Sequence, residues 1–301
     1  GGHFATRFLR EDGEWMSHMT QFNSSADISP TGGQMPRLLG LAHASKLYRQ
    51  MDEVARAKSA FTAGGDEIAI GTIGDASTSE GLFWETMNAA GVLQVPMLMN
   101  VWDDGYGISV PKEYQTTKGS ISNALSGLEM EEGTNGLVIY RVKGWDYPAL
   151  ISTYESAVQR CRKEHVPVLV HVEEVTQPQG HSTSGSHERY KSEERMAWAA
   201  EYDCIAKFGQ FLVLEGAATQ EELEVIRKKA KKDVRQEQKA AWAAFRVPLD
   251  GELKEAIAAN EALEPDAAEI AALREGLFPG RAEVHGALRQ MIARHAGSSA
   301  P

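Results

Sequence analysis

Two strand-length apolar runs, each leading into an acidic loop, constrain the fold of this chain more than any other feature. Residues 68–73 lead into Asp75, and residues 96–102 lead into Asp103 and Asp104. One helix-length segment connects the two runs, and such a strand–helix–strand crossover places its strands parallel. Open α/β sheets bind ligands at the carboxyl edge of their strands. The carboxylates are therefore expected to converge there around a hard cation such as Mg²⁺, which also binds phosphate oxygens.

The segment after Asp75 is predicted to form the crossover helix, over residues 78–93. Ser77 and Glu80 have the spacing of a capping box, which predicts that this helix begins directly after the loop. A helix N-terminus beside a turn of small residues such as Ala76 favours a diphosphate. One acidic loop alone is as readily a turn or a helix cap. Two such loops in one crossover favour a ligand site.

Composition excludes several classes of protein. The chain has 301 residues and a formal net charge of −11, which argues against nucleic acid as its main partner. Its longest apolar runs have strand length, so no membrane span is predicted. Cys161 and Cys204 show no disulfide or metal spacing and suit a cytoplasmic enzyme. The length allows one large α/β domain, expected over residues 1–245, followed by a helical extension or linker over residues 246–301.

The rest of the chain continues the alternation of strands and helices. Asp146 is expected to cap one helix, and Pro36 lies in the first turn of another. Thr219 and Glu222 form a second capping box, and the helix that they open is expected to break at Pro248. The predicted elements are helices over residues 34–51, 147–164 and 219–245 and strands over residues 137–142 and 166–172.

Short motifs in a fixed order resemble a known family. Gly74-Asp75-Ala76 followed by Asp103-Asp104 resembles the thiamine diphosphate signature, a Gly-Asp-Gly turn followed by one or two asparagines. The wider set resembles the alpha subunit of the decarboxylating component of 2-oxoacid dehydrogenase complexes. That set is residues 74–81, Asn88-Ala-Ala, Val95-Pro96 and residues 105–109. His181-Ser-Thr-Ser with Arg189-Tyr190 resembles the branched-chain, 2-oxoisovalerate type. The resemblance covers about residues 23–245.

This resemblance implies a three-layer, parallel-sheet α/β fold of the transketolase-like kind that binds thiamine diphosphate, with a helical C-terminal extension. It implies oxidative decarboxylation of a branched-chain 2-oxoacid, followed by acyl transfer to a lipoyl-bearing acyltransferase. In the family a second subunit supplies the Glu that activates the cofactor, so a beta subunit or a fused beta domain and a hetero-oligomer are expected. The family has a further helical segment before this point, so the chain is expected to be a fragment, a processed form or a partly ordered one. Its Ala/Glu-rich tail would then suit a linker into a fused beta half.

The family's functional residues map onto this sequence by motif. Asp75, Asp104 and the Tyr106 carbonyl are the implied Mg²⁺ ligands, and His181 is the implied catalytic residue, which donates to the diphosphate. A role of His187 in support of His181 is the less favoured alternative to a purely structural one, while His43 and His171 are expected to be structural. The full set of expected cofactor-binding residues is Ser29, Thr31, Gly74, Asp75, Ala76, Ser77, Asp104, Tyr106, Ile108 and His181.

Two departures from the family leave alternatives open. Asp104 stands where the family has Asn, and Trp102 stands where branched-chain relatives have a basic residue. The alternatives are a pyruvate- or acetoin-type alpha subunit, a non-catalytic assembly module and a Mg²⁺-dependent phosphohydrolase. The last requires a second Asp two residues after Asp75, where Ser77 stands instead. The loop that carries Ser182 and Ser184 is phosphorylated in some relatives.

Overall fold

The computed structural model describes residues 6–25, 28–57, 60–181, 183, 185–276 and 279–297. The chain divides into two compact units, Gly1–Ala217 and Ala218–Pro301. The boundary expected between residues 245 and 246 falls inside a helix that belongs wholly to the second unit. The compact α/β unit therefore ends earlier than the sequence indicated, because the helix after residue 219 packs with the C-terminal helices.

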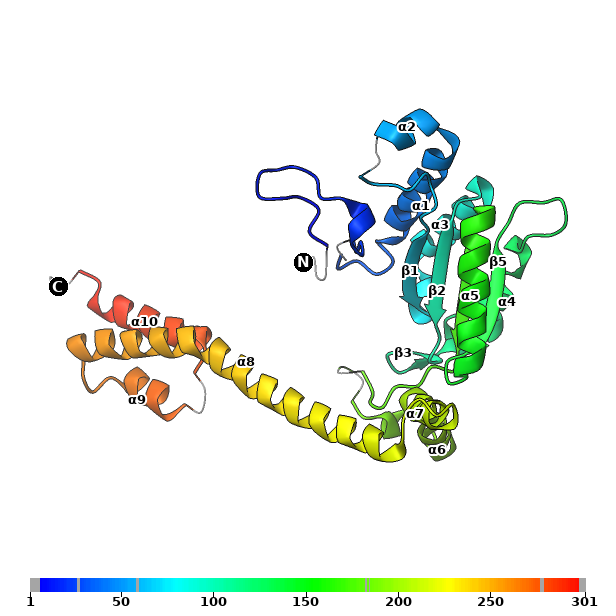
Figure 1. Cartoon of the computed structure of the whole chain (residues 1–301). Coiled ribbons are helices and arrows are strands. Elements are labelled where there is room, and N and C mark those ends of the chain that lie inside the picture. The colour runs from blue at the N-terminus through cyan, green and yellow to red at the C-terminus, as the bar shows by residue number, and fades with distance from the viewer. Residues whose placement is uncertain are drawn as a thin grey trace. The chain divides into compact units, whose positions relative to one another are not determined.

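The first unit is built on four parallel strands in the order β1-β2-β6-β5 (Figure 1). The central strands β2 and β6 are buried along almost their whole length, as unbroken apolar runs predict. Each observed strand begins and ends within two residues of its prediction. The strands are β1 (Ala69–Gly74), β2 (Met97–Trp102), β5 (Val138–Lys143) and β6 (Val168–Glu173).

Helices cover both faces of this sheet, which confirms the three-layer α/β architecture (Figure 1). Successive residues of β2 point to opposite faces. Met97 and Met99 pack with α1 (Met35–Gln50), α3 (Gly81–Leu93) and the start of α4 (Ile121–Ala124). Leu98 packs on the other face with α5 (Tyr147–Glu164). The expected cap at Asp146 is confirmed, since its Oδ1 accepts from the Ala149 amide at 3.1 Å at the start of α5.

The predicted capping box at Ser77 and Glu80 is wrong. Residues Ala76–Ser79 form a 3₁₀ turn, and α3 begins only after Glu80, whose side chain caps nothing. The Thr78 hydroxyl donates to the Asp75 carbonyl at 2.5 Å, and this local bond stabilises a tight turn in place of the first α-helical turn. The first loop is therefore longer than expected.

The second unit contains three helices in its described residues, α8 (Gln220–Leu263), α9 (Ala268–Glu275) and α10 (Arg281–His295). Thr219 and Glu222 form the predicted capping box. The prediction that Pro248 breaks the helix is wrong, because α8 continues to Leu263. A proline removes one intrahelical hydrogen bond, whereas Ala256 beyond it packs with Leu273 and Val284 of the other two helices. This tertiary packing outweighs the local cost.

None of the helices in the described residues is long and apolar enough to cross a membrane.

Shorter elements complete the described part of the chain. The remaining elements are α2 (Asp52–Ala57), β3 (Tyr106–Gly107), β4 (Val110–Pro111), α6 (Glu193–Glu201), α7 (Cys204–Leu214) and the 3₁₀ turns His18–Thr20, Ala76–Ser79, Lys112–Tyr114, Thr117–Gly119, Ser126–Leu128 and His187–Arg189.

Candidate metal and diphosphate site

The loops after β1, β2 and β6 are joined by backbone hydrogen bonds at the carboxyl edge of the sheet. The Asp75 amide donates to the Trp102 carbonyl at 3.1 Å, and the Asp103 amide donates to the Val172 carbonyl at 2.9 Å. The Val175 amide in turn donates to the Asp103 carbonyl at 2.9 Å. The sheet register thus continues past the strand ends and brings the two acidic loops side by side, as the crossover predicted.

Asp75 is the best candidate for a metal ligand. Its side chain is 6% exposed, and its Oδ2 atom is buried without a hydrogen-bond partner in the described part of the chain. Burial, together with the nearby carboxylates of Asp103 and Asp104, raises the pKa of Asp75 to about 7. A buried carboxylate oxygen that no donor meets, close to other acids, fits a site for a hard cation.

Asp103 instead shapes the second loop. Its Oδ1 accepts from the Gly105 amide at 2.8 Å, and its Oδ2 accepts from Lys112 Nζ at 2.7 Å. The same Oδ2 lies 3.0 Å from His171 Nε2, whose Nδ1 lies 2.8 Å from Ser122 Oγ. Burial opposes ionisation, but the bonds from His171 and Lys112 hold the pKa of Asp103 below its ordinary value. His171, expected to be only structural, thus contacts the site directly.

Asp104 lies beside Asp75 with part of its side chain accessible. Its Oδ1 accepts from the Tyr106 amide at 3.1 Å, and its Oδ2 accepts from Gln177 Nε2 at 2.8 Å. Burial raises the pKa of Asp104. No cluster of three or more His, Cys, Asp or Glu side chains in the described residues is arranged to hold a metal. A metal here would take its third ligand from the backbone, and the Tyr106 carbonyl is the expected one.

Ile108 occupies a strained turn next to these ligands. This β-branched residue has a φ of 61°, a conformation that its side chain rarely adopts. Its side chain is 52% exposed at the turn between β3 and β4. Backbone strain of this kind is retained where the surrounding structure requires it, often at functional sites. An exposed apolar side chain at this turn suits contact with a ligand.

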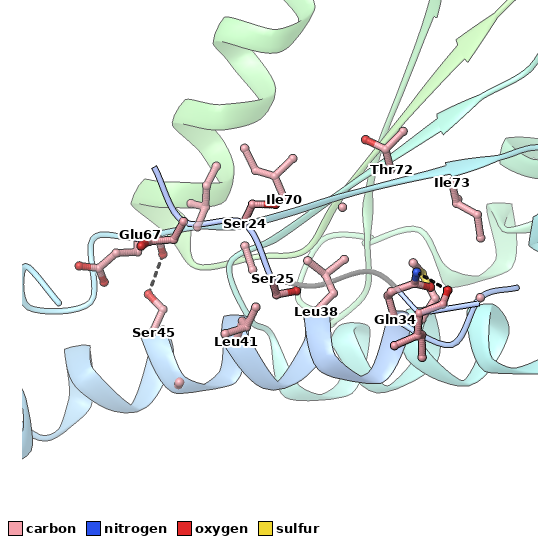
Figure 2. Close-up of a pocket in the computed structure, with 18 of the residues that line it drawn as sticks. Ser24, Ser25, Gln34, Leu38, Leu41, Ser45, Glu67, Ile70, Thr72 and Ile73 are labelled. Carbon is pink, nitrogen blue, oxygen red and sulfur yellow. Dashed lines mark hydrogen bonds between the residues drawn. The ribbon is translucent and has the colours of Figure 1, made fainter. Parts of the chain in front are cut away.

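A cavity of about 780 Å³ adjoins the first acidic loop, between α1 and β1. Figure 2 shows Leu38 and Leu41 of α1 on one side and Ile70 of β1 on the other. Ser45 Oγ of α1 donates to the Glu67 carbonyl at 2.6 Å and ties the helix to the segment before β1 (Figure 2). Four of the expected cofactor-binding residues line this cavity, namely Ser29, Thr31, Gly74 and Ser77. Its size is within the usual range for cofactor sites.

His181 does not line that cavity. It is exposed and lines a separate hollow of about 400 Å³ with residues of its own loop, including His187. Its Nδ1 lies 2.9 Å from the Thr183 hydroxyl. Gln177, at the start of the loop, reaches Asp104, but the catalytic assignment of His181 stays a prediction. Ser182 and Ser184 of this loop lie outside the described residues.

Three cationic side chains near the acidic loops were missed by sequence reasoning. Lys112 pairs with Asp103, and Arg195 Nη2 donates to the Asp104 carbonyl at 3.3 Å. Lys191 Nζ lies 4.6 Å from the centroid of the Tyr106 ring. Burial lowers the pKa of Lys191, although the negative charge of Asp104 acts to raise it. The only signal in the sequence was that Lys191 follows the Arg189-Tyr190 motif directly.

The pKa of Asp75 predicts how Mg²⁺ affinity depends on pH. Protons compete with the metal for this carboxylate, so the affinity should rise about tenfold per pH unit below 7 and level off above it. The pKa of Asp75 is raised on folding, so the metal-free protein should lose stability as the pH rises towards 7. Calorimetric Mg²⁺ titrations and urea unfolding on both sides of pH 7 test both trends. Asp75→Asn is the control and should flatten them, and pH-independent Mg²⁺ affinity in the unmodified chain would contradict the assignment.

Comparison with known proteins identifies the family of this chain. The family model described as "Dehydrogenase E1 component" matches residues 11–247. The 3-methyl-2-oxobutanoate dehydrogenase subunit alpha of Mycobacterium tuberculosis (strain CDC 1551 / Oshkosh) is 31% identical over 167 residues, covering 55% of this chain and 43% of the relative. The pyruvate dehydrogenase E1 component subunit alpha of Bacillus cereus is 28% identical over 234 residues, covering 76% of this chain and 56% of the relative.

This chain thus spans about half the length of these curated relatives. Among solved structures, the transketolase from Campylobacter jejuni subsp. jejuni NCTC 11168 aligns with a TM-score of 0.36 at 16% identity, covering 49% of this chain and 20% of its own. The family model covers most of the α/β unit and both acidic loops. The chain therefore belongs to the dehydrogenase E1 component family.

Proposed function

We propose that this chain is the alpha component of a thiamine diphosphate-dependent 2-oxoacid dehydrogenase and holds the diphosphate and Mg²⁺ half of the active site. The observation that carries the proposal is the buried Oδ2 of Asp75, which has no hydrogen-bond partner among the described residues and lies near Asp104 at the carboxyl edge of the sheet. Family membership supports the reaction class, since relatives are named as 2-oxoacid dehydrogenases.

The residues of the site divide the work. Asp75, Asp104 and the Tyr106 carbonyl would hold Mg²⁺, and the cavity lined by Ser29 and Thr31 would receive the cofactor. When bound, thiamine diphosphate supplies the carbon nucleophile and the electron sink for loss of CO₂. The protein's own task is to position these groups and balance their charge. Lys112 and His171 already balance Asp103, so two acidic side chains remain for the metal.

A branched-chain 2-oxoacid, 2-oxoisovalerate, is the proposed substrate. Support comes from the His181-Ser-Thr-Ser block and from the Mycobacterium tuberculosis relative named for 3-methyl-2-oxobutanoate. The Bacillus cereus relative, named for pyruvate, makes pyruvate the second candidate. A beta subunit or fused beta domain would complete the site, and a lipoyl-bearing acyltransferase would accept the acyl group.

Mg²⁺-dependent binding of thiamine diphosphate is the first expected result. Calorimetric titration of the 301-residue chain should give saturable binding with Mg²⁺ and none with excess chelator, because the metal links the carboxylates to the diphosphate. Thiamine without its diphosphate is the control ligand and should bind far more weakly. Absence of binding with Mg²⁺, both with and without a beta partner, would favour the non-catalytic assembly module instead.

A further inference from the structure

Lys191 is a buried cation whose ammonium contacts no carboxylate directly in the described residues. The residue is only 9% exposed, yet its ammonium makes no ion pair there. Its Nζ lies 3.5 Å from His187 Nε2 and faces the rings of Tyr106 and Tyr190 at 4.6 and 5.8 Å from their centroids. Burying an ammonium is costly unless an anion pairs with it. The arrangement therefore indicates that an anion belongs beside Lys191.

The aromatic contact does not explain this burial. Lys207 makes the same kind of contact, with its Nζ 4.7 Å from the centroid of the Tyr202 ring, and its side chain stays partly exposed. Cation–π attraction at exposed sites is small, so it does not require a lysine to be enclosed. Lys191 directly precedes Ser192, the N-cap of α6, and its Nζ faces Tyr106 at the end of the second acidic loop.

The neighbours of Lys191 place this anion at the candidate site. Tyr106, whose ring it faces, carries the carbonyl proposed to bind Mg²⁺, and the Asp104 carboxylate is close enough to interact with the ammonium. The two other cations here are already engaged, since Lys112 pairs with Asp103 and Arg195 donates to the Asp104 carbonyl and stacks 4.1 Å from the Trp198 ring centroid. Among these cations, the ammonium of Lys191 is therefore the one available to pair with a ligand.

We propose that Lys191 binds an oxyanion of the bound ligand, either the diphosphate of the cofactor or the carboxylate of the 2-oxoacid. The proposal rests on the function proposed above.

Three variants of the whole chain test this role, Lys191→Met, Lys191→Arg and the matched control Lys207→Met. Each is titrated calorimetrically with inorganic diphosphate plus Mg²⁺, and then, loaded with Mg²⁺ and thiamine diphosphate, with 2-oxoisovalerate. Lys191→Met should weaken binding of one of the two anions about tenfold or more, the usual effect of losing a charged hydrogen bond. Lys191→Arg should retain most of the affinity, and Lys207→Met should retain all of it.

The anion that is weakened identifies the source of the oxyanion. Equal affinities of Lys191→Met and the unmodified chain for both anions would overturn the proposal, as would failure of the unmodified chain to bind either. Thermal unfolding without ligand shows whether Lys191→Met is folded, and Lys191→Gln repeats the test if it is not. Diphosphate binding that depends on Lys191 without any thiamine diphosphate binding would support the anion site and contradict the proposed function. Binding of cofactor and substrate that is unchanged in Lys191→Met would support the proposed function and contradict the anion site at Lys191.

Discussion

Replacing Asp75 by alanine is expected to abolish Mg²⁺-dependent binding of thiamine diphosphate while the chain stays folded. The Asp75 side chain is buried, and its Oδ2 has no partner in the described residues, so the ionised carboxylate does not stabilise the metal-free fold and its removal should leave the chain folded. Its pKa of about 7 shows that the metal-free site disfavours the charged form. Because a bound metal would stabilise this charge, removal of the carboxylate should also remove metal binding. Calorimetric titration measures the binding, and circular dichroism during urea unfolding measures the fold.

Two further variants make that result specific. Asp66→Asn alters an exposed acid just before β1, at the opposite end of the strand, where it pairs with Arg49 at 3.6 Å, and should leave binding unchanged. Asp104→Asn should also be tolerated, because Asn is the ligand that the resembled family has at this position. Undiminished binding by Asp75→Ala would falsify the metal assignment. Collapse of binding in Asp104→Asn would show that this position is not equivalent to the family's asparagine.

The second large effect is expected from the beta partner. The chain alone should give no turnover of 2-oxoisovalerate with an artificial electron acceptor, and addition of the partner should restore it. The reason is that the resembled family takes the Glu that activates the cofactor from a second subunit. His181, the expected catalytic residue of this chain, is exposed and lines a hollow apart from the main cavity.

The controls separate binding from catalysis. Thiamine diphosphate and Mg²⁺ should still bind to the chain alone, since the proposed metal ligands all belong to it. The partner combined with Asp75→Ala should remain inactive. Robust turnover by the isolated chain would contradict a site shared between two proteins.

The sheet and its acidic edge were predictable because their signals are local. The apolar runs before Asp75 and Asp103 indicated β1 and β2, and crossover geometry made the strands parallel. Asp146 and Thr219 cap their helices as expected, since a cap is encoded within a few residues. The Ser77 capping box failed for a local reason, because the bond from Thr78 to Asp75 competes with it.

Other features depend on contacts between distant parts of the chain. The bond between His171 and Asp103 requires the register in which His171 lies opposite Val101, and no motif encodes that register. Lys191 lies at the site only because its segment folds back against the second acidic loop. Pro248 was misread because tertiary packing of the helix beyond it outweighs a local preference.

The contacts of Asp103 with Lys112 and His171 make substitutions at these three positions depend on one another. Its carboxylate is matched by Lys112 on one side and by His171 on the other. A change of Asp103 to a neutral residue would leave Lys112 as an uncompensated positive charge next to the proposed cation site. Loss of either base would instead leave a buried acid insufficiently balanced. In proteins that descend from this one, Asp103, Lys112 and His171 are therefore expected to be substituted together, as double or triple changes, and not one at a time.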